Sequence, residues 1–205
     1  MRKHPTATLA AASPFPRRPT RAQAEQAVRT LLAWAGDDPD RDELRDTPKR
    51  VVEAYAEYFS GYRQDPIALL QEPMPGEISS FNDIVLLRGI EVESHCAHHI
   101  SPFSGRASVA YIPAGKAVGL SRLARVVDAY ARRLQTQEDL TNDIAKAIDA
   151  ALAPSGVAVL IEAEHHCIAA RGPKQHGLTA VTTRFLGAFD SDAALQERFM
   201  RMARG

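Results

Sequence analysis

The chain has 205 residues, of which 45% are hydrophobic and 24% are charged, and its 25 basic side chains balance its 25 acidic ones. This average composition excludes a collagen-like or wholly disordered chain, and no apolar run approaches the roughly 20 residues that span a bilayer. A neutral surface has no general attraction for nucleic acid or an anionic membrane, so we expect neither as a partner. A chain of this length can bury one proper core.

The first 20 residues are basic and rich in proline, and we expect residues 1–20 to form a mobile tail. A transit peptide is the alternative, whereas a secretory signal would need a continuous apolar stretch that this segment lacks. We expect one domain over residues 21–205. It would comprise N-terminal helices over 21–75, a core over 76–190 and a C-terminal helix over 191–205.

Two helices and a helical turn are predicted in the N-terminal part. Thr20 can cap a helix whose apolar residues follow helical spacing up to Gly36. A second helix is predicted to begin at 47–48, where a threonine cap precedes a first-turn proline, and a short helical turn should follow at 65–66. Residues 76–81 are predicted to form a loop.

Extended structure is predicted from Ile84 onward. The runs 84–96 and 107–113 favour a pair of antiparallel strands, with a loop containing Pro102 and Gly105 between them. The remaining elements are expected to be a helix capped by Ser121, a helix ending at Pro154, strands over 157–170 and 178–189, and a helix over 192–203. This order is typical of an α+β fold and not of alternating βαβ units.

Both cysteines lie beside histidines. A Cys96-x-x-His99 spacing lets a single turn bring two ligands around one ion. Alternation along the strand over 157–170 places His165 and Cys167 on its apolar face, as the other half of a chelating site. Thiolate and imidazole ligands together suit zinc better than iron or copper.

The simplest metal assignment uses Cys96, His99 and Cys167 as ligands and leaves His98 and His165 free. Three protein ligands and one open position are the pattern of catalytic zinc, beside which spare histidines can move protons. One alternative is a closed structural site in which His98 or His165 is the fourth ligand. Another is a pair of buried cysteines without metal, and spacing alone leaves all three open.

A basic cluster lies between the two halves of this site. Residues 116–133 carry five basic side chains and one acid, a net charge of +4. The segment 119–121 leads into a predicted helix, whose N-terminal N–H groups can bind an anion. A phosphorylated substrate would fit, with Arg122, Arg125 and Arg171 as candidate ligands, and an ordinary solvated helix face is the alternative.

Several blocks in chain order resemble GTP cyclohydrolase I, the zinc-dependent type I family of the tunnelling fold. They are TPKRVVEAY, ESHCAHHISPFSG, AYIPAGKAVGLSRLARVVDAYARRLQTQEDLT, GVAVLIEAEHHCIAARG and TAVTTRFLG, within roughly residues 45–190. The resemblance implies an α+β tunnelling fold (T-fold), in which an antiparallel sheet has helices packed on one face and an N-terminal helical segment. It also implies a cytoplasmic, toroidal homodecamer with active sites between subunits.

The resemblance also implies a role for individual residues. The Zn²⁺ ligands would be Cys96, His99 and Cys167, and the catalytic residues would be His98, His165 and Ser121. The substrate-binding residues would be Gln137, Glu138, Arg122, Arg125, Arg171 and Arg50, with the Glu138 carboxylate accepting hydrogen bonds from the guanine edge.

The reaction implied is zinc-dependent hydrolysis of GTP at guanine C8, with ring opening, release of formate and rearrangement to 7,8-dihydroneopterin triphosphate. This is the first step of tetrahydrofolate and pterin synthesis. The chain departs from the commonest family pattern at Ala97, Arg122, Asp139 and His166, which bears on rate and affinity more than on reaction class. Two other hypotheses are a non-catalytic, zinc-stabilised nucleotide-binding oligomer and the related deazaguanine nitrile reductase, against which the clustering of cysteine with histidine argues.

Overall fold

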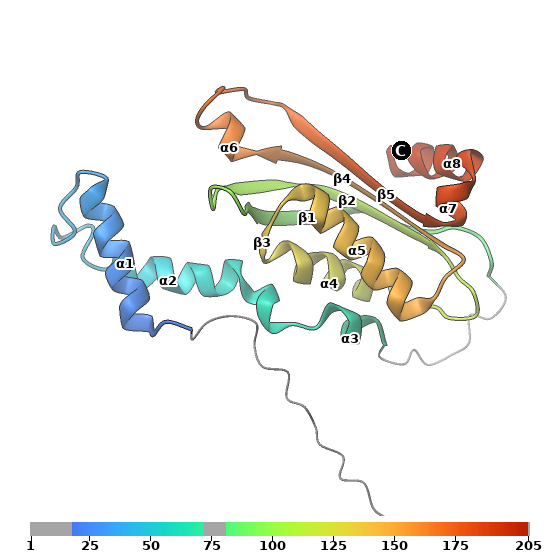
Figure 1. Ribbon diagram of the computed structural model, residues 1–205, viewed down its shortest axis with the longest axis horizontal. Helices are drawn as coiled ribbons and strands as arrows, with labels where there is room; N and C mark the ends of the chain where they lie inside the picture. The colour runs from blue at the N-terminus through green and yellow to red at the C-terminus, as the bar shows by residue number, and fades with distance from the viewer. Residues whose placement is uncertain (1–17, 72–80, 205) are drawn as a thin grey trace, which may run out of the picture. The chain divides into compact units, whose positions relative to one another are not determined.

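The computed structural model describes residues 18–71 and 81–204 (Figure 1). The chain divides into two compact units, one ending at Tyr55 and the other beginning at Ala56, and each is described by itself. Most of the predicted tail, and all but the last residue of the loop predicted at 76–81, lie outside the described residues. Within the described ranges, no helix is long and apolar enough to cross a membrane. The single domain over 21–205 stays a prediction.

The first unit contains helix α1, Arg21–Trp34, and most of α2, Thr47–Tyr58. The Thr20 hydroxyl accepts a hydrogen bond from the Gln23 N–H at 3.2 Å, and the Gln23 side chain accepts one from the Thr20 N–H at 2.9 Å. This capping box satisfies backbone donors that would otherwise have no partner at the start of α1. The predicted cap of α1 is therefore confirmed, whereas Thr47 is the first residue of α2 and not its cap.

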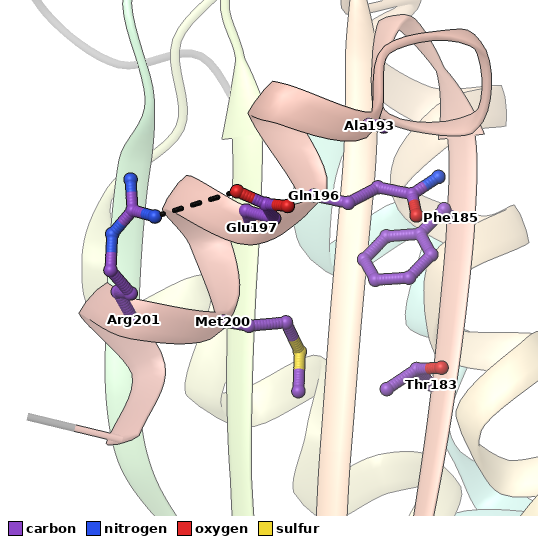
Figure 2. A pocket seen from close by; sticks show the side chains of 7 residues that line it. All are labelled: Thr183, Phe185, Ala193, Gln196, Glu197, Met200 and Arg201. Atoms are coloured by element: carbon purple, nitrogen blue, oxygen red, sulfur yellow. Dashed lines mark ion pairs between the residues drawn. The ribbon is translucent and has the colours of Figure 1, made fainter.

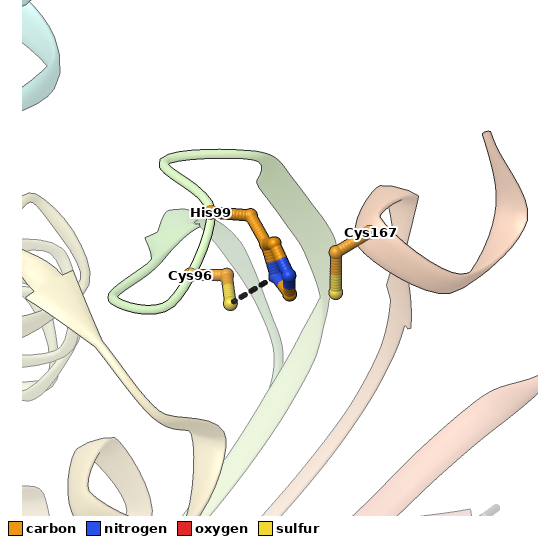
Figure 3. A group of neighbouring side chains, drawn as sticks. All are labelled: Cys96, His99 and Cys167. Carbon is orange, nitrogen blue, oxygen red and sulfur yellow. Dashed lines mark hydrogen bonds between the residues drawn. The ribbon is translucent and has the colours of Figure 1, made fainter. Parts of the chain in front are cut away.

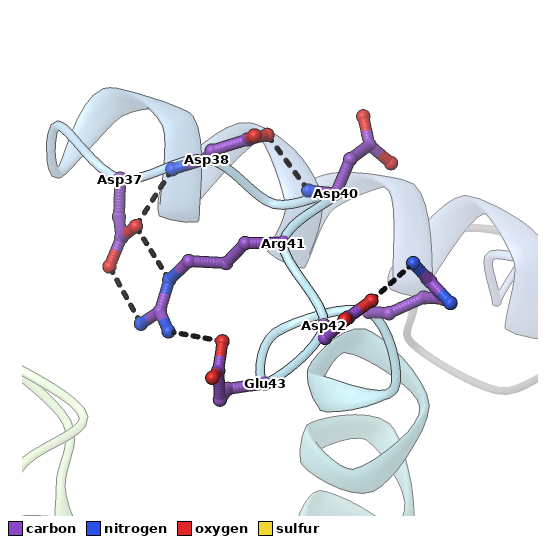
Figure 4. Close-up of polar contacts among 7 residues, drawn as sticks. Asp37, Asp38, Asp40, Arg41, Asp42 and Glu43 are labelled. Atoms are coloured by element: carbon purple, nitrogen blue, oxygen red, sulfur yellow. Dashed lines mark hydrogen bonds and ion pairs between the residues drawn. The ribbon is translucent and has the colours of Figure 1, made fainter.

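The loop between α1 and α2 is acidic, and several of its carboxylates have partners within the loop (Figure 4). The Arg41 guanidinium lies 2.8 and 3.0 Å from the two Asp37 carboxylate oxygens and 3.0 Å from Glu43. Its hydrogen bonds hold the pKa of the Asp37 carboxyl below the usual range. Asp37 and Asp38 also accept backbone N–H groups at 2.8 and 2.9 Å, so these charges stabilise the loop.

The second unit is built on a five-stranded sheet in the order β3-β1-β2-β4-β5. The strands are β1 Val85–Cys96, β2 Pro102–Ile112, β3 Leu134–Gln135, β4 Gly156–His165 and β5 Thr179–Gly187. All neighbouring pairs are antiparallel except β1 and β3, which are parallel. The α+β class is therefore confirmed, with a mixed sheet. The prediction of a loop around Pro102 and Gly105 is wrong, because both residues belong to β2. Pro102 pairs with β1, and Gly105 pairs with both β1 and β4. The strand β3 was not predicted.

Helices cover both faces of this sheet. Alternate residues of β2 and β4, such as Val109 and Val159, pack in a core with the helices α3 Pro66–Gln71, α4 Leu120–Ala131 and α5 Gln137–Leu152. The intervening residues, such as Ala110 and Leu160, pack instead against Phe189 of α7, Ala188–Ser191, and Phe199 of α8, Ala193–Arg204. The expectation of helices on one face is therefore incomplete.

The start of α4 differs from the prediction by two residues. Gly119 occupies the cap position, and its carbonyl accepts a hydrogen bond from the Arg122 N–H at 2.9 Å. Ser121 is an exposed residue of the first turn and caps nothing. The predicted helix is therefore present, but Ser121 is not its cap.

The register of β2 brings together the ends of two other strands. Near its start, Pro102 pairs with His95 of β1, and Phe103 pairs with His165 of β4. Because Cys96 directly follows His95, the two cysteine-containing segments lie on either side of the start of β2.

Candidate metal centre

Cys96 ends β1 and begins a tight turn. Its carbonyl accepts hydrogen bonds from the N–H groups of His99 and Ile100 at 3.3 and 2.8 Å, and its own N–H donates to Ser101 at 2.8 Å. The turn closes with Ile100 in the left-handed region, at a φ of 52°. It brings His99 Nδ1 to 4.0 Å from Cys96 Sγ, so the Cys-x-x-His spacing places both groups on one side of the turn.

Cys167 reaches the same point from another direction (Figure 3). Strand β4 ends at His165, and Cys167 lies on the short helix α6, His166–Ala169, so the prediction that it continues the strand is wrong. Both cysteines are free thiols, Cys96 being buried and Cys167 half-buried. The ligand atoms of Cys96, His99 and Cys167 all lie within 4.8 Å of one another.

The donor set and its spacing fit a zinc ion. Tetrahedral zinc with thiolate and imidazole ligands places neighbouring ligand atoms about 3.6–3.8 Å apart. The 4.0 Å between Cys96 Sγ and His99 Nδ1 is close to this value, and the 4.8 Å limit leaves at most about one ångström to close. Two thiols and an imidazole also favour zinc, because magnesium and calcium bind oxygen ligands instead.

The surroundings of Cys167 favour its neutral thiol. Burial raises the pKa of Cys167, and the neighbouring Cys96 thiol raises it further. A divalent ion bound to Cys167 would favour its thiolate instead. The charge of Arg171 acts in the same direction as a metal, because it lowers the pKa of Cys167.

Of the two remaining predicted histidines, His98 is exposed in the Cys96 turn and places Nδ1 3.7 Å from Cys96 Sγ. His165 is half-buried at the end of β4. Neither belongs to the group formed by Cys96, His99 and Cys167, so that group offers three candidate ligands with two histidines close by.

His165 is held by an aromatic ring and by a buried amide. Its imidazole stacks on Phe103 with ring centroids 4.6 Å apart and an interplanar angle of 8°. Its Nε2 lies 2.8 Å from Oε1 of Gln137. Burial lowers the pKa of His165, and the charge of Glu138 opposes this, so the imidazole is neutral at neutral pH.

Gln137 lies inside the protein, where its side chain is only 2% exposed. Its Nε2 donates to the carbonyl oxygens of Ile161 and Ala180, both at 3.0 Å, and to the Thr182 hydroxyl at 3.1 Å. Sequence reasoning placed this residue beside Glu138 against the substrate. In the structure its carboxamide instead contacts β4, β5 and His165.

The predicted substrate residues fall into two groups in space. Glu138, exposed in the first turn of α5, and Arg171 act electrostatically on His165 and Cys167, so both lie near the centre. The start of α4, with Ser121, Arg122 and Arg125, is tied to the far end of β2. Its anchor is a 3.2 Å hydrogen bond from the Val118 N–H to the hydroxyl of Tyr111, which pairs with Val157 near the start of β4.

The chain therefore does not bring these three α4 residues to the cysteines. Phe103 and Tyr111 lie near opposite ends of β2, and the metal group flanks only the Phe103 end. Arg50, the remaining predicted residue, is exposed on α2 in the first unit, 3.7 Å from a carboxylate oxygen of Asp46.

Three contacts of the site were not predicted. Phe103 stacks on His165, Gln137 binds the His165 ring, and Gln135 of β3 accepts a hydrogen bond from the Ala97 N–H at 2.9 Å. Of these three contacts, only the one made by Phe103 could have been predicted from the sequence, because this aromatic residue follows the Cys96 turn within a few residues. The other two depend on where α5 packs against the sheet.

A cavity of about 530 Å³ lies elsewhere, between β5 and α8 (Figure 2). Apolar Phe185 and Met200 line it, and Glu197 and Arg201 form an ion pair of 3.7 Å at its wall. None of the residues predicted for the site lines this cavity. It is therefore separate from the candidate metal centre.

Comparison with known proteins gives a family. The model of the GTP cyclohydrolase I family matches residues 24–204. A solved structure of the archaeosine synthase QueF-Like in the apo form covers 51% of this chain and 94% of its own, at 25% identity. Its TM-score of 0.43 is too low for the two folds to be compared.

Curated relatives match at much higher identity. GTP cyclohydrolase 1 of Hyphomonas neptunium is 55% identical over 186 residues, which cover 91% of this chain and 90% of the relative. GTP cyclohydrolase 1 of Sinorhizobium fredii is 55% identical over 192 residues, covering 92% and 91%. That of Maricaulis maris is 49% identical over 185 residues, covering 90% of each chain.

The geometry predicts how Cys167→Ser changes metal binding. Because the substitution removes one of two thiolates, we expect the affinity for Zn²⁺ to fall more than about 100-fold, beyond the loss caused by changing an outer residue. His166→Ala, which truncates the exposed neighbour, should keep wild-type affinity. The measurement is the zinc-to-chain ratio after competition with a chelator, and equal ratios in wild type and Cys167→Ser would contradict the assignment.

Proposed function

Because the chain belongs to the GTP cyclohydrolase I family, we propose that it hydrolyses GTP at guanine C8, opens the imidazole ring and releases formate. The product would be 7,8-dihydroneopterin triphosphate, the first intermediate toward folates and pterins, made in the cytoplasm. The observation that carries the proposal is a cysteine–histidine–cysteine group beside His165, in a chain matched to the family over residues 24–204.

The metal proposed is Zn²⁺, held by Cys96, His99 and Cys167. A bound Zn²⁺ supplies Lewis acidity and activates water near neutral pH. The spacing of the three ligand atoms and the presence of two thiols and one imidazole support this choice.

Proton transfer is proposed for the two histidines beside the ligands. His165 is neutral because burial lowers its pKa, and its protonated form is correspondingly a stronger acid. Such a group can take a proton from the attacking water and pass it to guanine N7 as the ring opens, which returns the imidazole to its neutral form. His98 is exposed in the Cys96 turn, where it can exchange protons with solvent.

Recognition of the guanine base is proposed for Glu138. A carboxylate can accept two hydrogen bonds, one from the ring N–H and one from the exocyclic amine of guanine. Its exposure at the start of α5 and its electrostatic effect on His165 support a position facing the same space. This geometry would set the base across the centre, with N7 toward His165.

The triphosphate is proposed to bind Ser121, Arg122, Arg125 and Arg171, with Arg50 from a subunit boundary. The three α4 residues lie at the other end of the sheet from the cysteines of their own chain. They can therefore meet a metal centre only if it belongs to another copy. This supports a toroidal homo-oligomer, a decamer of the T-fold type, whose active sites lie between subunits.

The sheet has edges through which such copies could join. In the described part of the chain, β5 pairs with β4 alone, and the outer side of β1 pairs with β3 only at His95 and Cys96. Val181 on β5 is 49% exposed, which is a large fraction for an apolar strand residue. Unpaired edges of this length are ready to continue a sheet into a neighbouring copy.

The activity is tested by incubating the zinc-loaded protein with GTP and measuring formate and the pterin product. We expect one formate for each GTP consumed, and no turnover by Cys96→Ser, which lacks a metal ligand. His166→Ala is the matched control and should turn over GTP at a rate near that of the wild type. Absence of formate from fully zinc-loaded wild-type protein would refute the proposal.

The shared site predicts complementation between two defective variants. Cys167→Ser lacks the metal half and Arg125→Ala lacks part of the phosphate half, so each alone should have low activity. Hybrids of differently tagged variants, mixed equally, should regain about one quarter of wild-type sites, because half the metal centres and half the phosphate halves are intact. Hybrids no more active than their parents would show that each chain builds its own site.

A further inference from the structure

The carboxamide of Gln137 can lie in only one orientation. Two of the three groups facing its Nε2 are the main-chain carbonyl oxygens of Ile161 and Ala180, each at 3.0 Å, and a carbonyl oxygen can only accept. If the amide were reversed, its own oxygen would face those two oxygens. The amide oxygen therefore points to His165.

Two threonine hydroxyls reinforce this orientation. Thr141 Oγ1 lies 2.7 Å from the carbonyl oxygen of Gln137, so the hydroxyl must donate to it. Because its one hydroxyl hydrogen is donated to that carbonyl oxygen, Thr141 must accept in its 2.6 Å contact with Thr182 Oγ1. Thr182 is then the donor in that contact, so it can only accept from Gln137 Nε2, at 3.1 Å.

These hydrogen bonds form a ring. It runs from the Gln137 side-chain N–H to Thr182, from Thr182 to Thr141, and from Thr141 back to the Gln137 main chain. The two hydrogens on Nε2 face three acceptors, so one N–H is shared between two of them. Thr141 and Gln137 are 1% and 2% exposed, and Thr182 is half-buried.

We propose that Gln137 is a positioning residue that holds the His165 ring by accepting its Nε2–H, and that Thr141 and Thr182 hold Gln137 in the orientation required. Oε1 of Gln137 accepts from His165 Nε2–H at 2.8 Å, which leaves Nδ1 as the nitrogen with a free lone pair. The stacked Phe103 ring fixes the imidazole plane. Nδ1 is therefore the ring nitrogen left to contact a substrate.

The role of His165 at guanine N7 rests on the proposed function, whereas the hydrogen bonds that hold its ring do not. In the proposed reaction, the histidine that serves guanine N7 would use Nδ1, and a ring held in one tautomer needs no rearrangement before each transfer. This arrangement also separates Gln137 from Glu138. Adjacent residues that sequence reasoning assigned together to the substrate would act on different partners, one on the histidine and one on the base.

The direct test is the tautomer of His165 in the zinc-loaded full chain. Magic-angle-spinning NMR of protein labelled with ¹³C and ¹⁵N at histidine distinguishes Nε2–H from Nδ1–H, and loss of signals in His165→Asn assigns them. We expect the neutral ring to be protonated on Nε2 in the wild type and to become a mixture of tautomers in Gln137→Leu. A wild-type ring protonated on Nδ1 would overturn the proposal.

Kinetics separates positioning from substrate binding. Gln137→Leu should lower kcat at least about tenfold while KM for GTP stays within about twofold, because only proton transfer is affected. Thr182→Val should lower kcat by a smaller factor, and Thr182→Ser, which keeps the hydroxyl, should restore it. The matched control is Thr183→Val, the exposed next residue of β5, which should match the wild type. A raised KM with unchanged kcat in Gln137→Leu would overturn the proposal.

The NMR test of the Gln137 proposal gives a result whether or not the proposed activity is correct. A protein that releases no formate would refute the activity, yet the tautomer of its His165 would still test the ring of hydrogen bonds. If Gln137→Leu does not fold, the wild-type NMR assignment and the Thr182→Val and Thr182→Ser pair remain. Equal kcat in Thr182→Val and wild type would overturn the part assigned to the threonines.

Discussion

The pairing of β2 with both β1 and β4 is the constraint on which the candidate centre depends. Cys96 and Cys167 are 71 positions apart in the sequence, and β2 separates the strands β1 and β4 that lead to them. Cys96 ends β1 and Cys167 follows β4, and both strands end beside the start of β2, where Pro102 pairs with His95 and Phe103 pairs with His165. A slip of one residue in either register would turn the neighbouring side chains to the other face and separate the ligands.

The local features of the fold were predictable because they depend on residues close in sequence. The Thr20 cap, the start of α2 and the turn from Cys96 to His99 each require only a few neighbouring groups. Contacts that depend on packing were not. The strand β3, the second helical layer of α7 and α8, and the hydrogen bond from His165 to Gln137 arise only once distant elements meet.

Gln137 shows how a sequence motif can conceal two environments. Gln137 and Glu138 are adjacent at the start of α5, but helical geometry turns one inward and the other to solvent. The buried amide finds partners on β4 and β5, while the exposed carboxylate remains available to a ligand. Likewise, the basic residues Arg122 and Arg125 of α4 lie toward the other end of the sheet from Cys96, and this is why the proposed site needs a second copy.

The central claim is that two thiolates and one imidazole of this chain bind one metal ion. X-ray absorption at the zinc edge of the zinc-loaded protein measures those ligands directly. The account predicts two sulfur ligands at about 2.3 Å and nitrogen or oxygen ligands at about 2.0 Å, one of them the His99 imidazole. A shell of four sulfurs, or a shell with no sulfur, would contradict it.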